Sequence, residues 1–303
     1  MALLDEVIKQ NAQRVKHRVW ICSDLQHWDP EETRLLLETA LADYHALALP
    51  CEQIWYLGDT TDGGNRENLR QVVTIQADLF AQLERPIYFT FGNHDFDDFR
   101  KNPGDGMDAL HAWRILRERP YWKLMEHLED FYFTASLGDY RLYFFGDHAA
   151  PDGSWIVTHG RVHGDAGAYP HSPEKWQKVR EQMAGESGPV ISIGHYAYPG
   201  GNRPSDLMGH LLPLPDTVRA HFYGHAHLGE ERLLQEHVYR KIAYANHQFI
   251  PQIDVASLER RKGNFVRSVF LEIDEDDTFG IYFRNHDLQI WEEAFFLDPR
   301  RRP

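Results

Sequence analysis

The fold is indicated most clearly by residues 53–62, which read QIWYLGDTTD. Residues 53–57 form a short run of mostly large apolar side chains, which is typical of a buried strand. Gly58 ends this run, and the carboxylates of Asp59 and Asp62 follow at once. In open α/β sheets, polar groups that bind ligands lie just beyond the carboxyl ends of the strands. The stretch therefore predicts an α/β protein with acidic groups at one edge of its sheet.

The same arrangement recurs on both sides of this stretch. Apolar runs at residues 18–23 and 86–91 predict two more strands. Leucines, valines and alanines at helical spacing predict helices over residues 30–48 and 66–84, the first with Pro30 in its opening turn. Alternation of apolar strands with helices indicates parallel βαβ units in a sheet that is covered on both faces.

Beyond residue 104 the sequence predicts shorter elements. We expect helices over residues 107–118, 121–129 and 173–183, and strands over residues 131–137, 140–146, 189–193, 219–223, 239–245, 266–273 and 278–283. Residues 149–173 are rich in Pro, Gly, His and Asp and are expected to form a loop insertion. No repeat or linker is visible, so we expect a single domain over residues 1–303, with strands within 239–283 completing a second sheet.

Composition excludes several classes of protein. A hydrophobic fraction of 42% excludes global disorder, and a net charge of −14 without a basic stripe argues against binding to extended nucleic acid. No apolar run is long enough for a membrane span or a secretory signal, so a cytoplasmic protein without membrane attachment is expected. Cys22 and Cys51, the two cysteines, lie in or beside predicted strands and exclude a disulfide framework. The oligomeric state is not indicated.

Five of the predicted strands lead into potential metal ligands. The candidate ligands, in chain order, are Asp24, Gln26, Asp59, Asn93, His195, His225 and His227. Singly, each such cluster is also typical of an ordinary turn, but five in order at strand ends favour a shared site. Carboxylate, amide and imidazole groups without a thiolate suit Mn, Fe or Zn better than an all-oxygen calcium cage, and their number suffices for two divalent ions.

The ordered series DxQ, GDxxD, GNHD, GH and GHxH resembles the calcineurin-like metallophosphoesterase superfamily over residues 18–228, about three quarters of the chain. The resemblance implies a four-layer sandwich in which two mixed β-sheets are flanked by helices. It also implies a hydrolase that cleaves phosphoester bonds by two-metal activation of a bridging hydroxide.

The resemblance also implies a role for each candidate residue. Asp24, Gln26, Asp59 and His227 would surround the first metal, while Asp59 bridges to a second metal completed by Asn93, His195 and His225. His94 would act as general acid to the leaving oxygen, and Asp95 or Asp62 would orient its ring.

Two positions leave alternatives open. Gln26 stands where most members of the superfamily carry histidine, and an amide oxygen is a weaker donor that favours a harder ion. A phosphoesterase-like scaffold that binds a protein partner therefore stays an alternative to an enzyme. His159 follows a short apolar run and competes with His195, which we prefer because it ends the more apolar strand after a predicted helix.

The substrate is inferred from what the sequence lacks. Protein Ser/Thr phosphatases of the superfamily resemble GDxVDRG and RGNHE, and neither arginine is present here. Without a bidentate clamp for a dianion, a small phosphodiester or nucleotide derivative is favoured, with a phosphomonoester as the alternative. The loops at 97–108, 149–173 and 197–210 offer further candidates for substrate contacts: the cations Arg66, Arg100, Arg161 and Arg203, and Tyr196 and Tyr198 to flank a base.

Overall fold

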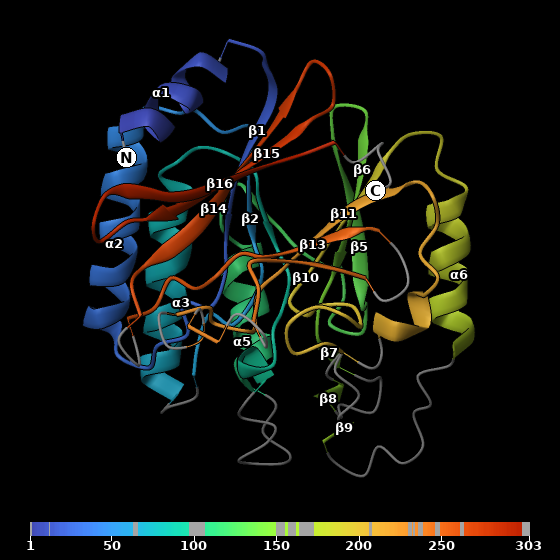
Figure 1. Ribbon diagram of the computed structural model, residues 1–303. Coiled ribbons are helices and arrows are strands. Elements are labelled where there is room, and N and C mark those ends of the chain that lie inside the picture. The colour runs from blue at the N-terminus through green and yellow to red at the C-terminus, as the bar shows by residue number, and fades with distance from the viewer. Residues whose placement is uncertain are drawn as a thin grey trace.

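The protein is represented by a computed structural model. The structure describes residues 2–11, 13–62, 66–96, 107–149, 155–156, 162–163, 173–205, 208–229, 232, 234–235, 239–245, 249–260 and 264–298. Two large sheets pack face to face in the middle of the molecule, with helices on their outer faces (Figure 1).

The first sheet has seven strands in the order β16-β15-β14-β1-β2-β3-β4. Their bounds are β1 Val15–Cys22, β2 Gln53–Tyr56, β3 Ile87–Phe89, β4 Trp122–Lys123, β14 Arg267–Asp274, β15 Phe279–Asn285 and β16 Ile290–Leu297. Strands β1 to β4 are parallel, whereas β14, β15 and β16 pair antiparallel at the β1 side. The parallel strands place their carboxyl ends at a common edge.

The second sheet has six strands in the order β12-β13-β11-β10-β6-β5. Their bounds are β5 Tyr132–Leu137, β6 Tyr140–Phe145, β10 Val190–Gly194, β11 Val218–Tyr223, β12 Ile242–Tyr244 and β13 Pro251–Asp254. Strands β6, β10, β11 and β13 are parallel, and β5 and β12 are antiparallel at the two edges. Both sheets are therefore mixed.

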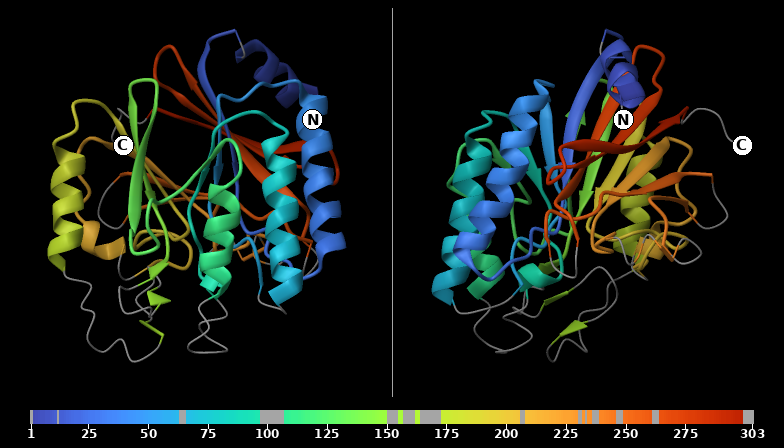
Figure 2. Two further views of the ribbon diagram at one scale, coloured as in Figure 1. Left: turned by 180° about the vertical axis from the view of Figure 1, so that it is seen from behind. Right: turned by 60° about the vertical axis from the view of Figure 1, so that its left-hand side comes forward.

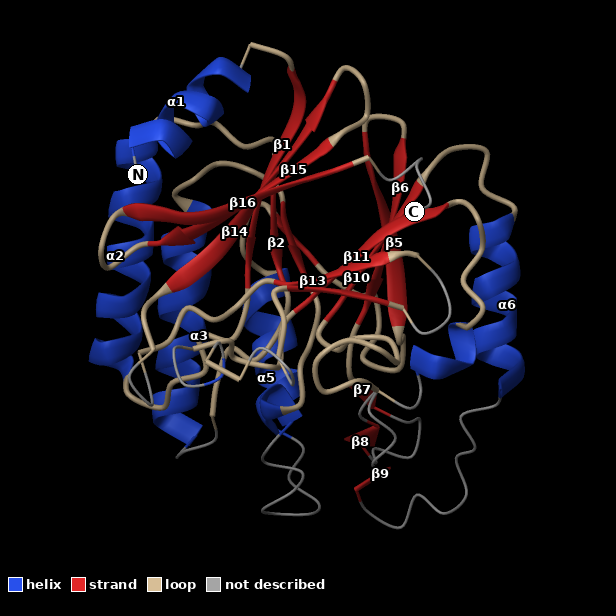
Figure 3. Ribbon diagram, in the orientation of Figure 1, coloured by secondary structure: helices blue, strands red, loops and turns tan. Residues whose placement is uncertain are grey.

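Helices cover the outer face of each sheet. They are α2 Pro30–Leu47, α3 Arg66–Ala81 and α5 Met107–Arg117 beside the first sheet, and α6 Pro173–Ala184 beside the second. Figure 2 shows the two groups of helices on opposite sides of the paired sheets, and Figure 3 separates helices from strands by colour. The remaining helical elements are α1 Ala2–Asn11 and the short 3₁₀ turns η1 His94–Phe96 and η2 Met208–Leu211. The expected four-layer sandwich is confirmed.

Strand alternation explains the layers. In β1, Val19 and Ile21 pack into the core between the two sheets, whereas Trp20 and Cys22 face the helices. All four side chains are fully buried, as expected for a strand with successive side chains on opposite faces of a covered sheet. Cys22 and Cys51 are buried and free.

Three sequence predictions are corrected. Residues 121–129 do not form a helix, because Trp122 and Lys123 pair with β3 as β4. Of the strands expected to complete the second sheet, β12 belongs to it, but β14 and β15 extend the first sheet. Strands β13 and β16 were not predicted. Within the expected loop insertion, the described residues form a small sheet of β7 His148–Ala149, β8 Trp155–Ile156 and β9 Val162–His163.

No helix in the described part of the chain is long and apolar enough to cross a lipid bilayer.

Candidate metal centre

Asp59 lies at the centre of the polar groups that follow the strands. Its Oδ1 accepts a hydrogen bond of 2.8 Å from the backbone N–H of His94. Its Oδ2 lies 3.2 Å from Nε2 of Gln26 and 3.2 Å from Nε2 of His195. Asp59 follows β2, and its fully buried carboxylate thus contacts groups that follow β1, β3 and β10.

Asp59 also belongs to two groups of potential ligand atoms. Atoms of Asp59, His195 and His225 all lie within 4.8 Å of one another, and so do atoms of Asp24, Asp59 and His227. Because Asp59 is common to both groups, a single carboxylate can contribute to two neighbouring cation sites. This division of the residues matches the two ligand sets that the resemblance implies.

The buried polar atoms at this place that make no hydrogen bond of suitable geometry to the described residues include Oδ1 of Asp24, Oε1 of Gln26 and Nε2 of His195. Gln26 uses its Nε2 on Asp59, so its amide oxygen remains available. Leaving a buried polar atom unsatisfied costs about 1–3 kcal/mol. Two oxygens and an imidazole nitrogen gathered in this way fit divalent cations, and Gln26 presents the correct atom for ligation.

Asn93 follows β3 and faces Tyr196, with Oδ1 of Asn93 3.2 Å from the Tyr196 hydroxyl. His227 lies on the other side of the site, where its Nε2 is 2.9 Å from Oδ1 of Asp24. All seven predicted ligands therefore fall within the described residues, at the carboxyl ends of the parallel strands of both sheets.

His94 pairs with Asp62 and not with Asp95. Its Nδ1 lies 2.9 Å from Oδ1 of Asp62, and the His94 side chain is 26% exposed. Asp95 is buried and accepts hydrogen bonds from the backbone N–H groups of Asp59, Thr60 and Gly92. Of the two carboxylates expected to orient the His94 ring, Asp62 contacts it and Asp95 bonds to backbone N–H groups. Asp95 holds the two ligand-bearing turns together.

Electrostatic coupling within the site shifts several pKa values. Burial, the largest single influence, would lower the pKa of His195, but the charge and hydrogen bond of Asp59 together with the charge of Asp24 and the bond to the Leu57 carbonyl raise it to about 10. Burial also opposes protonation of His227, whose pKa is raised to about 9 by Asp24 and Glu259. Burial, with the charge of Asp59, raises the pKa of Asp95 to about 6. The site therefore combines close histidine–carboxylate pairs with the like charges of Asp59 and Asp95.

The turns that carry the ligands have unusual backbone geometry. Five predicted ligands have positive φ angles: Asp24 at 54°, Gln26 at 23°, Asp59 at 55°, His225 at 65° and His227 at 47°. Non-glycine residues adopt this conformation uncommonly, and it also occurs at turns away from the site such as Ala48 and Glu84. Gly92 is needed for a different reason, because a Cβ there would lie 2.3 Å from Oδ1 of Asp59 and 2.7 Å from the His195 ring.

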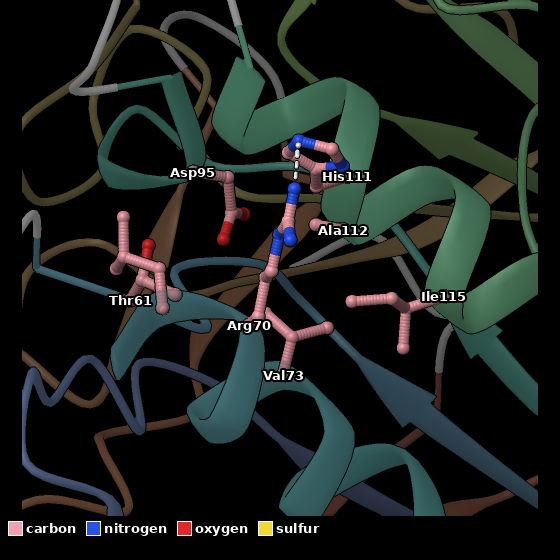
Figure 4. Close-up of a pocket in the computed structure, with 8 residues that line it drawn as sticks. Thr61, Arg70, Val73, Asp95, His111, Ala112 and Ile115 are labelled. Atoms are coloured by element: carbon pink, nitrogen blue, oxygen red, sulfur yellow. Dashed lines mark hydrogen bonds between the residues drawn. The ribbon is translucent and has the colours of Figure 1, made fainter. Parts of the chain in front are cut away.

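A small pocket between α3 and α5 lies behind this site. It has room for about one water molecule, with a volume of 10 Å³. Asp95 lines its inner end, and Arg70 lies 3.1 Å from the His111 ring at the other side (Figure 4). Since the pocket is far too small for an organic substrate, a substrate has to approach the ligand cluster from elsewhere.

A family model for calcineurin-like phosphoesterases matches residues 17–229, which is more than half of the chain. The chain belongs to the calcineurin-like phosphoesterase family. Among curated proteins, none matches the sequence.

A solved structure supports the fold of this phosphoesterase, and a second one is less similar. A purple acid phosphatase from yellow lupin (Lupinus luteus) seeds is similar with a TM-score of 0.53 at 14% identity, over 92% of this chain and 53% of the lupin chain. The phosphoesterase thus spans about half the length of the lupin enzyme. A protein of Thermus thermophilus is similar with a TM-score of 0.48 at 10% identity, over 94% of this chain and 99% of that chain.

Two buried carboxylates of the phosphoesterase were missed by sequence reasoning. Glu259 accepts a hydrogen bond from Nδ1 of His227, although no motif surrounds it in the sequence. Asp147 follows β6 and has its Oδ2 3.2 Å from the Tyr196 hydroxyl. The pair Gly146-Asp147 after an apolar run is the same signal that singled out Asp59, and it could have identified Asp147.

Other expectations for this phosphoesterase have mixed outcomes. Tyr196 and Tyr198 were expected to flank a base of the substrate. Both side chains are buried, so they do not have the exposed position that this role requires. Arg203 is exposed on the loop that follows β10. Burial, His195 and His227 lower the pKa of His225, and the charge of Arg203 contributes least to this lowering. The side chain of Arg66, together with Arg100, His159 and Arg161, lies outside the described residues.

Proposed function

We propose that this phosphoesterase is a two-metal hydrolase of small phosphodiesters or nucleotide derivatives. The observation that carries the proposal is the shared position of Asp59 in two groups of ligand atoms, each within 4.8 Å. Asp24, Gln26 and His227 would complete one cation site, and Asn93, His195 and His225 the other. Divalent ions such as Mn, Fe or Zn held there would supply Lewis-acid polarisation of the phosphoryl group and an activated water.

Two contacts of His94 support a role for this residue at the leaving group. Asp62 holds Nδ1 of the ring at 2.9 Å, which leaves Nε2 as the nitrogen that carries a mobile proton. The backbone N–H of His94 is bonded to Asp59, so the ring is fixed relative to the centre of the site. A partly exposed imidazole in this position supports proton donation to a departing oxygen.

The preference for a diester rests on missing cations. Phe91 occupies the position before Gly92 where the resembling protein phosphatases carry arginine. It is fully buried and packs against Phe89 and Phe96, with ring centroids 4.9 Å and 5.6 Å apart. A phosphomonoester dianion therefore finds no bidentate guanidinium at this position, which favours an ester with one negative charge fewer.

The test compares bis(p-nitrophenyl) phosphate with p-nitrophenyl phosphate. The purified protein is stripped of metal and reloaded separately with Mn²⁺, Fe²⁺, Zn²⁺ or Co²⁺, and Asn93→Ala is assayed in parallel. We expect metal to restore hydrolysis with kcat/KM at least about tenfold higher for the diester, because no guanidinium neutralises the second charge of the monoester. A tenfold ratio corresponds to about 1.4 kcal/mol of transition-state stabilisation. Asn93→Ala should lose this activity.

Two outcomes would contradict the proposal. A higher kcat/KM for the monoester than for the diester would identify a phosphomonoesterase instead. The supporting observation for that alternative is the positive charge of exposed Arg203, which helps to lower the pKa of His225. In that case Arg203→Gln should weaken monoester hydrolysis more than diester hydrolysis. If neither ester is hydrolysed with any metal, a scaffold that binds a protein partner becomes the better explanation.

A further inference from the structure

Asp147 is a buried carboxylate to which the family motifs assign no role. It follows β6, which pairs in parallel with β10, so Asp147 emerges at the same edge of the second sheet as His195. Its side chain is fully buried. A carboxylate that is removed from water needs strong hydrogen-bond donors, and one of its donors is the phenol of Tyr196.

Tyr196 links Asp147 to a predicted ligand. Its hydroxyl lies 3.2 Å from Oδ2 of Asp147 and 3.2 Å from Oδ1 of Asn93. The ring is held on the opposite side, where it packs against the rings of His195 and His225 at centroid distances of 4.8 Å and 4.6 Å.

The backbone of Tyr196 is fixed as well. Nε2 of His221 donates a hydrogen bond of 2.7 Å to the Tyr196 carbonyl. The other ring nitrogen of His221 lies 3.0 Å from the Ser192 hydroxyl within the second sheet. The position of the phenol is therefore set by β10 and β11 and does not depend on a ligand.

A phenol has one proton and here faces two oxygens. A carboxylate is a stronger acceptor than a carboxamide oxygen, so the Tyr196 proton belongs with Asp147. The Tyr196 oxygen can then only accept a hydrogen bond from Asn93, which requires the Asn93 NH₂ group to face it. In the structure Oδ1 of Asn93 is the atom that faces Tyr196. A half-turn of the carboxamide exchanges its oxygen and nitrogen, and the exchanged orientation turns the Asn93 oxygen away from Tyr196.

We propose that Asp147 is a positioning residue for the metal centre. By accepting the Tyr196 proton, it makes Tyr196 an acceptor for the Asn93 NH₂ group and thereby directs the Asn93 oxygen to a cation. In the opposite arrangement Tyr196 would donate to the Asn93 oxygen and compete with the metal for it. The inference rests on the proposed two-metal site, and it adds Asp147 and Tyr196 to the groups on which metal affinity depends.

The test measures Mn²⁺ affinity by titration calorimetry for the wild type, Asp147→Asn, Tyr196→Phe and the double variant. Each single variant should weaken one of two Mn²⁺ sites by about 10–100-fold, the range for groups that orient metal ligands. The double variant should be no weaker than either single variant, because both residues act through Asn93. Tyr198→Phe is the matched control, since the Tyr198 hydroxyl is buried but bonds to Ser192 and not to the site.

The outcomes separate this inference from the proposed function. If the wild type binds no Mn²⁺, the proposed function is wrong, and the inference that rests on it is wrong as well. If the wild type binds two ions and both single variants bind them equally well, the inference alone is overturned. Thermal unfolding of the metal-free variants identifies a purely structural role, which would lower stability without changing Mn²⁺ affinity. Tyr196→Phe retains the ring packing and keeps the test valid if Asp147→Asn folds poorly.

Discussion

Glu259 accepts a hydrogen bond from Nδ1 of His227, and the opposite nitrogen of the same ring, Nε2, lies 2.9 Å from Oδ1 of Asp24. The buried carboxylate therefore fixes both the tautomer and the direction of a predicted ligand. Carboxylate groups that orient histidines in this way are typical of metal sites.

Replacing Glu259 should weaken metal binding without unfolding the protein. We expect Glu259→Gln to lower Mn²⁺ affinity by about 10–100-fold, because a neutral amide holds the His227 ring less firmly. Titration calorimetry measures the effect. Glu118→Gln is the control, since Glu118 is exposed just beyond α5. Equal affinity in Glu259→Gln and the wild type would show that Glu259 does not orient the ligand.

Adding one methyl group at Gly92 should disable the site. The Cβ of Gly92→Ala would meet Oδ1 of Asp59 at 2.3 Å, so Asp59 or the chain must move. We expect kcat/KM for whichever phosphate ester the protein hydrolyses to fall about 100-fold, the scale associated with misplacement of reacting groups by about 1 Å. Gly185→Ala is the control, because the nearest atom to a Cβ there lies at an ordinary 3.5 Å. Near wild-type activity in Gly92→Ala would contradict the described geometry.

Loss of His94 should depend on the leaving group. A general acid matters most when the departing oxygen is strongly basic, so His94→Ala should slow hydrolysis of an alkyl or phenyl ester by about 10²–10⁴-fold. The p-nitrophenyl ester should be affected much less, because its leaving group departs readily as an anion. Steady-state assays of both esters, with Asp62→Asn in parallel, provide the comparison. An equal loss for both esters would argue against proton donation by His94.

Acid should destabilise the fold through His221. Burial lowers the pKa of this fully buried histidine from 6.5 to about 4, although its bonds to Tyr196 and Ser192 oppose the shift. Between pH 6.5 and about pH 4, His221 is therefore protonated in the unfolded chain but neutral in the folded chain. The free energy of unfolding consequently falls as the pH falls. Denaturant unfolding should show a loss of about 2 kcal/mol from this group between about pH 7.5 and pH 5.

The control for this prediction is His221→Gln, which cannot titrate. Its free energy of unfolding should be lower at neutral pH but should depend less steeply on pH over the same interval. An identical pH dependence in variant and wild type would assign the acid sensitivity to other groups.

Local sequence patterns predicted the elements near the site well. Helix α2 begins at Pro30 as predicted, and the Asp29 side chain caps it by accepting from the N–H groups of Glu31 and Glu32. Such signals lie within a few residues of one another, so the sequence displays them directly.

The pairing of strands that are far apart in the sequence was harder to predict. Strand β14 lies next to β1, with Val19 opposite Leu271, and no local feature of either strand specifies that partner. Residues 121–129 have the apolar spacing of a helix, yet Trp122 packs beside Tyr56 and Phe89 in the core and pairs with β3. Burial of a large aromatic side chain overrode the local preference in this case.

The positions of the predicted metal ligands could be read from the sequence because each follows an apolar strand. The groups that orient them were not, since Glu259 lies in a segment without a motif and Asp62 and Asp95 are equally close to their turns in sequence. Which carboxylate meets His94 is decided by how the turns after β2 and β3 fold against each other, which only the three-dimensional arrangement shows.

The positive φ angles of five predicted ligands have an evolutionary consequence. Left-handed backbone costs an L-residue about 1–2 kcal/mol, so together these five positions cost a sizeable part of the roughly 5–15 kcal/mol that stabilises a typical domain. Glycine or asparagine would relieve that cost wherever ligation no longer matters. Relatives that have abandoned catalysis should accordingly drift toward Gly and Asn at positions 24, 26, 59, 225 and 227, while those still under selection for it should keep the costlier side chains.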